Sequence, residues 1–359
     1  MKAGASDAGR AGFREPVSVP GFPAGGCEAP EPCSGEADDR ESRRAEIRVG
    51  EADDGTPLLS FLANRFRYLD AAEWTAAIRA GRLRVNGTTA EAEAALRAGD
   101  RVEFRMDDLP EPPVRTDYRV VFRDGHLLAV DKPGNLPCHP GGRYFRHTLW
   151  HLLRRDEGLE APRFLHRLDR ETSGLVLVAR TADAARAGQR LFVGGAIRKI
   201  YQVLVEGRFP AGTVRAEGRL AADAASPIRK RRRFIPRDSV HPETLPVADA
   251  QGCRTRFRRI AATERLSLLA AVPETGRSHQ IRATLHALGF PVTGDKMYGV
   301  DETLFLRFIE DRLTAEDRTH LRLPRQALHA AGLDFSHPIT GRPIRLRSAL
   351  PAEIHSLLG

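Results

Sequence analysis

The chain has 359 residues, of which 41% are hydrophobic, and its formal net charge is +9 at pH 7. This length provides for two or more hydrophobic cores, and the hydrophobic content excludes a wholly disordered protein. No apolar run approaches the roughly 18 residues of a membrane-spanning helix, so a membrane partner is not expected.

The cysteines indicate a reducing compartment and no structural metal. They have neither close paired spacing nor histidines at the distances found in zinc fingers. We therefore expect no bound metal and a cytoplasmic location. The four residues are Cys27, Cys33, Cys138 and Cys253.

Residues 1–46 are predicted to be a disordered tail. The segment is rich in Gly, Pro, Ala and acidic residues, and it has neither apolar periodicity nor the apolar stretch of a signal peptide. A start codon assigned too far upstream explains the same composition equally well. Because the tail is acidic on balance, residues 47–359 are more cationic than the whole chain, which favours a polyanionic partner such as RNA or DNA.

A small domain of two helices and a short sheet is predicted next, over 47–108. Apolar residues recur at helical spacing over 58–66, and Asp70 with Glu73 makes a capping box for a second helix. The Asn-Gly dipeptide at 86–87 predicts a hairpin.

Arginines cluster around this predicted helix pair and would give it one basic face. For any single one of them, an ordinary solubilising surface is the better interpretation. The cluster consists of Arg65, Arg67, Arg79, Arg82 and Arg84.

Prolines predict a stiff linker over 109–116, because proline fixes φ and cannot extend either flanking element. A larger domain is predicted over 117–359. Strand-like runs and helical stretches are mixed there without a regular β-α-β period, which favours an α+β fold over a doubly wound sheet. The predicted strands are 120–122, 127–130, 174–179, 201–206 and 266–272, and the predicted helices are 182–192 and 278–288.

A polar loop over 166–174 runs directly into an apolar strand, a position where catalytic groups are often found. Asp169 lies there between Arg167 and Arg170. A nearby guanidinium would lower the pKa of this carboxyl by roughly 1–3 units and keep it ionised. An ionised, partly desolvated aspartate can act as a nucleophile or a base. A structural ion pair that pins the loop is an equally weighted alternative.

A second candidate site opens the helix predicted at 278–288. At 3.6 residues per turn His279, Arg282 and His286 share one helical face, where they would present positive charge to an anion. No Glu completes a metalloprotease motif beside these histidines, which argues against metal binding. A solvated polar face is the more common outcome of such a pattern.

Two further groups fit RNA. Lys199 and Tyr201 point to the same side of a predicted strand and would flank a planar ligand, although a core tyrosine is the favoured alternative. The basic run 229–233, which includes Arg231, is predicted to be an exposed loop suited to phosphate contacts. No P-loop or Gly-x-Gly-x-x-Gly fingerprint occurs, so no nucleotide cofactor is expected.

In combination, these motifs resemble the RluA/RluD family of pseudouridine synthases. The loop at 166–174 is similar to the HRLDxxTSG signature of that family, and seven further blocks follow the order of the family over 117–359. The small domain resembles the αL-type RNA-binding domain of ribosomal and RNA-modifying proteins. The further blocks are Asp131-Lys132-Pro133, His139-Pro140, Lys199-x-Tyr201, 275–282, 294–299, 325–330 and 337–341.

The resemblance implies isomerisation of uridine within RNA by an α+β enzyme with a mixed, largely antiparallel sheet, a central cleft and flanking helices. It implies that Asp169 is the catalytic aspartate, that Tyr201 stacks on the base and that Arg282 pairs with the aspartate, with Arg277 as the second choice. Attack on the sugar, attack on the base and removal of a ribose proton stay open as routes. No cofactor is implied.

We expect a monomer that acts on structured RNA, with large-subunit ribosomal RNA ahead of transfer RNA. Two other classes compete: a non-catalytic RNA-binding protein of ribosome assembly, and a glycoside hydrolase. The second normally needs two carboxylates about 5–10 Å apart, and only one stands out. The residues expected to contact RNA are Arg79, Arg82, Arg167, Lys199, Arg231, Arg277 and His279.

Overall fold

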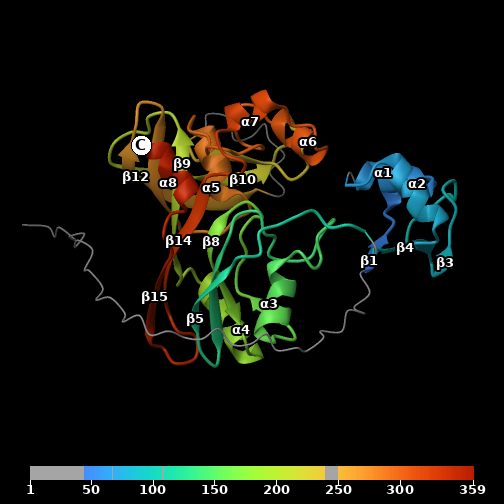
Figure 1. Ribbon diagram of the computed structural model, residues 1–359, viewed down its shortest axis with the longest axis horizontal. Coiled ribbons are helices and arrows are strands. Elements are labelled where there is room, and N and C mark those ends of the chain that lie inside the picture. Colours follow the sequence, from blue (N-terminus) through green and yellow to red (C-terminus); the bar gives the residue numbers. More distant parts are fainter. Residues whose placement is uncertain (1–43, 67, 107–108, 239–249) are drawn as a thin grey trace, which may run out of the picture. The chain divides into compact units, whose positions relative to one another are not determined.

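The computed structural model describes residues 44–66, 68–106, 109–238 and 250–359. Helices and strands are mixed, and the strands form two sheets, so the α+β class is confirmed (Figure 1). Most of the predicted tail and Arg67 lie outside the described residues. The predicted end of the tail at residue 46 is too late, because a strand begins at Arg44 and its apolar side packs on the core of the small sheet.

The small domain contains a four-stranded sheet in the order β1-β4-β2-β3 and two helices, as predicted. Asp70 and Glu73 form the predicted capping box, in which each backbone N–H donates to the other side chain, at 2.8 and 2.7 Å. Trp74 is fully buried in a core built from this segment alone. The elements are β1 Arg44–Arg48, η1 Glu51–Asp53, α1 Leu58–Arg65, α2 Ala71–Arg79, β2 Leu83–Val85, β3 Thr88–Thr89 and β4 Arg101–Arg105.

The larger sheet has eleven strands, nine of them in the order β11-β10-β12-β13-β9-β14-β8-β6-β5, with β15 on β14 and β7 on β8. Every pair is antiparallel except β8 with β14. The strands are β5 Arg119–Arg123, β6 Leu127–Lys132, β7 Arg163–Phe164, β8 Ser173–Ala179, β9 Arg198–Glu206, β10 Thr213–Ala222, β11 Arg232–Pro236, β12 Gln251–Ala262, β13 Leu266–Pro273, β14 Leu328–Ser336 and β15 Pro343–Arg347.

Helices cover this sheet, and none of the described ones is long and apolar enough to cross a membrane. They are α3 Leu149–Glu157, α4 Ala182–Val193, α5 Gln280–Ala287, α6 Thr303–Ile309, α7 Ala315–Leu321, α8 Ala352–His355 and η3 Ser356–Leu358.

One half of the large sheet, β5 to β8, is covered on both faces. Leu175 and Leu177 of β8 pack in one core cluster with α4, whereas Val176 and Val178 pack in another with α3. This explains why β8 is apolar at every position rather than at alternate ones. The strand is a rigid support for the polar loop that precedes it.

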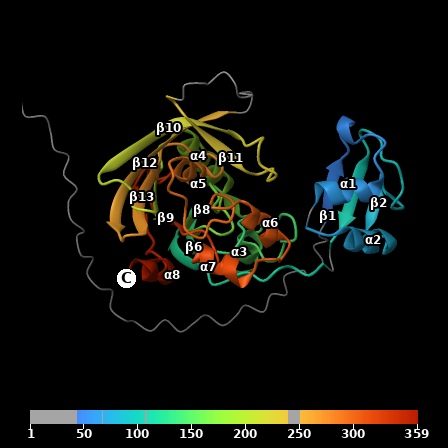
Figure 2. The same cartoon turned by 90° about the horizontal axis from the view of Figure 1, so that it is seen from above.

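The other half, β9 to β13, is covered on one face only. Phe257 of β12 and Ala271 of β13 are buried together with Ile281 and Leu285 of α5. Figure 2 shows α5 on the inner side of these curved strands. The opposite side chains of β12 are exposed, so that this strand alternates between buried and exposed residues.

Candidate active site

The loop that carries Asp169 is held by a tight turn and by a close approach of two strands. The Thr172 N–H donates to the Asp169 carbonyl at 3.1 Å, and β8 begins at the next residue. Gly174 has a φ of +109°, and a Cβ there would lie 2.3 Å from the Ala330 carbonyl oxygen of β14. Only glycine combines this backbone conformation with such an approach.

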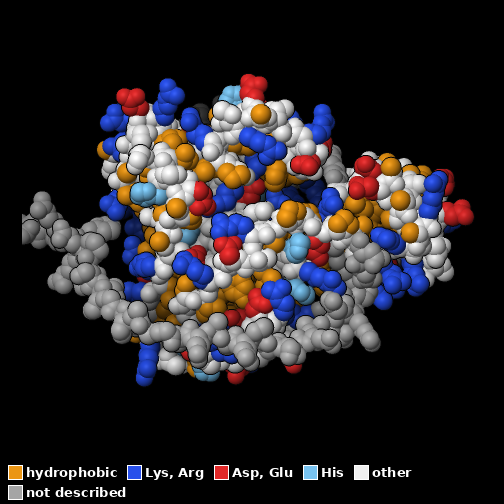
Figure 3. Space-filling model, in the orientation of Figure 1, with side chains coloured by type: hydrophobic (Ala, Val, Ile, Leu, Met, Phe, Trp, Pro, Cys, Tyr) orange, Lys and Arg blue, Asp and Glu red, His pale blue; other side chains and the backbone are white. Residues whose placement is uncertain are grey.

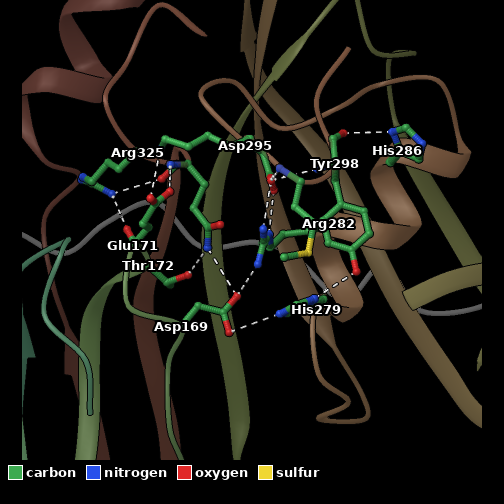
Figure 4. A network of polar contacts seen from close by, with 12 residues as sticks. Asp169, Glu171, Thr172, His279, Arg282, His286, Asp295, Tyr298 and Arg325 are labelled. Carbon is green, nitrogen blue, oxygen red and sulfur yellow. Dashed lines mark hydrogen bonds and ion pairs between the residues drawn. The ribbon is translucent and has the colours of Figure 1, made fainter. Parts of the chain in front are cut away.

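Arg282 of α5 joins two carboxylates. Its guanidinium donates to Asp169 Oδ2 at 2.7 Å, and to Asp295 at 2.6 and 2.9 Å. The Asp169 side chain is 38% exposed, whereas those of Arg282 and Asp295 are 8% and 0% exposed. The N–H groups of Met297 and Tyr298 also donate to Asp295. The guanidinium is therefore fixed from behind and presents one edge to Asp169 (Figure 4).

This arrangement sets the charge of Asp169. Burial alone would raise the pKa of Asp169, but the positive charge and hydrogen bond of Arg282 outweigh burial and lower the pKa to about 2. Burial likewise opposes the charge of Arg282, but Asp295 outweighs it and raises the pKa of Arg282. At neutral pH the site thus holds an ionised, partly exposed carboxylate.

The hydrogen-bond partners of Tyr298 assign the proton of His279. The buried Tyr298 hydroxyl accepts from the Arg232 N–H at 2.7 Å, and His279 Nδ1, 3.0 Å away, is the one described group placed to accept its own proton, so we assign Nδ1 as the acceptor. Burial, together with the charge of Arg282, lowers the pKa of His279 to about 4. The imidazole is therefore neutral with its proton on Nε2, which lies 4.0 Å from Asp169 Oδ1.

A second set of contacts holds the loop from its other side. Gln326 donates to Thr172 Oγ1 at 2.6 Å, and the fully buried Lys132 donates to the Arg170 carbonyl at 3.2 Å. Lys296 donates to Glu171 at 2.9 Å. The loop thus has partners on three separate segments of the chain, which restricts the position of its aspartate.

The structure brings Arg282, and not Arg277, to Asp169. Arg277 is exposed and donates to the Gly252 carbonyl at 3.4 Å, and Lys199 donates to the Thr275 carbonyl at 3.0 Å. Tyr201 is half-buried; burial raises the pKa of its hydroxyl, with a contribution from the Asp169 charge. Arg167 is exposed on the loop that carries Asp169.

Two predictions about local structure are wrong. His279 does not lie within the helix: it precedes the first turn in the left-handed region, with a φ of 58°, a conformation that few non-glycine residues adopt. The face that holds Arg282 and His286 is not solvated either. It is turned inward because Asp295 and the Tyr298 carbonyl supply its hydrogen-bond partners.

The basic run at 229–233 is not wholly an exposed loop. Its last two residues begin β11, and Arg231 is turned inward with a side chain only 14% exposed. The Arg231 guanidinium pairs with Asp223 at 2.7 Å and with Glu302 at 3.2 Å. Asp223 lies eight positions before Arg231 and Glu302 lies on a distant segment, so neither partner is part of the basic run on which the prediction was based.

Sequence reasoning assigned no role to Asp295, Tyr298 or Gln326. Asp295 and Tyr298 lie in the family motif at 294–299, and Gln326 lies in the motif at 325–330. The residues were therefore part of the resemblance, but no chemical role was predicted for them. In the part of the chain that the structure describes, no group of three or more His, Cys, Asp and Glu side chains is placed to hold a metal ion.

Comparisons with known proteins lead to one family of enzymes. The family described as RNA pseudouridylate synthase matches residues 126–287. The chain is 33% identical over 309 residues to the ribosomal large subunit pseudouridine synthase D of Xanthomonas campestris pv. campestris, with 84% of this chain and 86% of that protein covered. It is 30% identical to the mitochondrial tRNA pseudouridine(32) synthase of Saccharomyces cerevisiae, with 68% of this chain and 51% of that protein covered.

A solved structure shows the same fold. Human RNA pseudouridylate synthase domain containing 1 superposes with a TM-score of 0.51 at 23% identity, over 67% of this chain and 86% of that one.

Proposed function

Because the chain belongs to the RluA/RluD family of RNA pseudouridine synthases, we propose that Asp169 is its catalytic carboxylate and that its substrate is a uridine of large-subunit ribosomal RNA. The chain is an isomerase that acts on RNA. In the reaction the C1′–N1 bond breaks and a C1′–C5 bond forms, while C5 loses its proton and N1 gains one. The observation that carries the assignment is the 2.7 Å contact between Arg282 and a partly exposed, ionised Asp169.

The roles of the neighbouring residues follow from the same geometry. The target base must leave its stack at a cost of a few kcal/mol, and stacking on Tyr201 would offset about 1–3 kcal/mol of this. Arg282 keeps Asp169 charged while water is excluded. The Nε2–H of His279 faces the same space as Asp169, so it would donate a hydrogen bond to a uracil carbonyl. Attack on the sugar, attack on the base and ribose deprotonation all use the same charged Asp169.

Tritium release tests the role of Asp169. RNA labelled at carbon 5 of uridine loses its label when pseudouridine forms, so wild type should release tritium. The Asp169→Asn variant removes the charge but keeps the shape, and release should fall by at least about 1,000-fold. Asp334→Asn, on an outer ion pair with Arg347, is the matched control and should react like wild type. Release by the Asp169 variant at the wild-type rate would exclude the role.

We favour ribosomal RNA because the Xanthomonas relative, whose alignment covers most of both chains, is named a ribosomal large subunit pseudouridine synthase. Transfer RNA is the second candidate, because a yeast relative carries that activity in its name. Labelled large-subunit ribosomal RNA and a labelled transfer RNA pool, both transcribed without modifications, should be compared. Release from the ribosomal transcript alone is expected, and release from transfer RNA alone would reverse the choice.

We also propose that the small domain contacts RNA. Arg79 at the end of α2 and Arg84 on β2 are exposed, whereas Arg82 is half-buried. Replacing Arg79 and Arg84 by Gln should weaken RNA binding and lower its salt dependence, by about one unit of slope for each lost phosphate contact. Filter binding between about 50 and 200 mM salt would measure both. An unchanged slope would exclude these two arginines as phosphate ligands.

A further inference from the structure

The outer face of the half-covered part of the large sheet is rich in arginine. Thr255 and Phe257 of β12 point inward and are buried, and the side chains between and beside them are exposed. In Figure 3, Lys and Arg side chains gather at the upper left, over β12. We call this surface the arginine face, and its exposed arginines are Arg215, Arg219, Arg237, Arg254, Arg256 and Arg258.

The register shows that these charges are placed side by side. Arg215 of β10 lies directly opposite Arg256 of β12, whereas Arg254 lies opposite Glu217. Like charges directly opposite one another destabilise a sheet. Along β12, arginines at every second position repeat at about 6.8 Å. The pair of Arg215 and Arg256 is therefore an arrangement that sheet stability alone does not favour.

Two described carboxylates lie among these arginines. Glu274 contacts Arg254 at 3.3 Å and Arg256 at 3.4 Å, and Glu217 contacts Arg237 at 3.2 Å. Both glutamates are themselves exposed, so the arginines that they contact stay accessible to an external anion.

The arginine face does not belong to the active site. Phe257 pairs with Ala271, and Ala271 pairs with Tyr201, so these three share the inner side of the sheet with α5. The neighbouring residue Arg256 therefore points to the opposite side. A strand of nucleic acid on this face cannot be the short stretch that presents its uridine to Asp169.

We propose that the arginine face binds the phosphate backbone of a second segment of the RNA substrate, away from the target uridine. This inference rests on the proposed function, because the polyanion is the RNA on which the enzyme acts. Guanidinium groups match phosphate oxygens in charge and geometry. The only large hydrophobic residue exposed on β12 is Ile260, at 45%, and no aromatic ring is among the exposed large hydrophobics of the described residues. The face therefore suits phosphate contacts better than base stacking or an apolar protein interface.

A matched pair of triple variants tests the proposal. The first is Arg215→Gln, Arg254→Gln and Arg256→Gln on the arginine face. The second replaces three other exposed arginines, Arg180, Arg186 and Arg190 at α4, and lowers the net charge equally. RNA affinity is measured by filter binding from 50 to 300 mM KCl with two probes, an unmodified large-subunit ribosomal RNA transcript and a ten-nucleotide oligouridine.

We expect the first triple to bind the long transcript about tenfold more weakly, with a salt slope smaller by about 2, and to bind the oligouridine like wild type. The control triple should change the long-transcript slope by less than one unit. The melting temperature of the first triple should be equal to or above that of wild type, because the opposed arginines are removed.

Two results would overturn the proposal. Equal losses in both triples would show that only total charge matters. An unchanged slope in the first triple would show that RNA does not contact this face, including the case in which it binds an acidic protein instead. Both readouts are binding measurements, so they stay interpretable if the proposed isomerisation or RNA choice fails in the tritium assay.

Discussion

Arginines lie on both sides of the β9–β13 half of the large sheet, and the two sides hold them in opposite ways. On the inner side Arg282 makes three hydrogen bonds to two carboxylates. On the outer side Arg237 pairs with Glu217, and Arg254 and Arg256 pair with Glu274, and all of these side chains are exposed. A buried guanidinium must bring its counter-charge within the fold, because desolvation is costly. An exposed one can leave that counter-charge to a ligand.

The loss of a single charge should therefore have different consequences on the inner and outer sides of this half of the sheet. On the inner side, the partner of a removed charge stays buried and uncompensated. On the outer side, water and salt screen whatever remains. The expected losses therefore decrease from the most buried partner to the most exposed.

Asp295→Asn should have the largest effect. This substitution leaves Arg282 with Asp169 as its remaining carboxylate partner of the two. It also replaces a carboxylate by an amide at a side chain that is 0% exposed. Breaking such a buried pair costs about 3–5 kcal/mol of unfolding free energy. A guanidinium displaced by about 1 Å would lower kcat about 100-fold. Urea unfolding and single-turnover tritium release measure the two losses, and wild-type values for both would show that Asp295 does not position Arg282.

Tyr298→Phe tests the proton arrangement of His279 with a smaller change. Without the hydroxyl, the Arg232 N–H loses its acceptor and His279 Nδ1 loses its donor, at a cost of about 1–3 kcal/mol. The proton of His279 is then free to move to Nδ1, so kcat should fall about tenfold at constant KM. Tyr118→Phe, which loses a contact to Asp156 outside the site, serves as the control. Equal activity of Tyr298→Phe and Tyr118→Phe would show that the tautomer of His279 does not affect catalysis.

Stability should depend on two neutral histidines. Burial lowers the pKa of His166 to about 3 and that of His279 to about 4, whereas both would titrate near 6.5 in the unfolded chain. As the pH falls below 6.5, the unfolded state therefore binds protons first. The contribution of these histidines to the free energy of unfolding should be constant above pH 6.5 and decline towards pH 4.

The His166→Gln variant should decline less steeply, since His166 accepts a hydrogen bond from the Leu177 N–H only while it is neutral. His320→Gln, at an exposed position, should retain the wild-type slope. Urea titrations at each pH would measure the slopes, and a flat profile in wild type would contradict the buried, neutral state of these histidines.

Asp334→Asn should have the smallest effect. Asp334 of β14 pairs with Arg347 of β15, whose side chain is 53% exposed. Exposed pairs contribute about 0–1 kcal/mol, so the free energy of unfolding should change by no more than this. If Asp334→Asn lowered the free energy of unfolding as much as Asp295→Asn, the buried and the exposed ion pair would not differ in their contribution to stability.

Local sequence patterns correctly predicted the helices, strands and turns that depend on residues close together in the chain. The capping box at Asp70, the Asn-Gly turn at 86–87 and the apolar run of β8 all depend on residues a few positions apart. The match of family motifs pointed to Asp169 and Arg282 together, although they are 113 positions apart.

Partners outside the segment on which a prediction was based account for what was missed. Arg231 is within a basic run but pairs with Asp223 and Glu302, and the strand at Arg44 pairs with a strand that ends at Arg105. His279 precedes its helix, and its ring contacts Tyr298, nineteen residues later. No periodicity within the segment records such contacts.

The parallel contact between β8 and β14 also joins the two halves of the large sheet beside the proposed active site. Only His329 with Ser173 and Ala330 with Gly174 are paired there, and this short ladder is adjacent to the Asp169 loop. Asp169 precedes one half of the sheet, whereas Arg282 packs on the other. The contact between the two side chains therefore depends on how the halves are joined, and a change that shifted this ladder would move Asp169 relative to Arg282 without touching either residue.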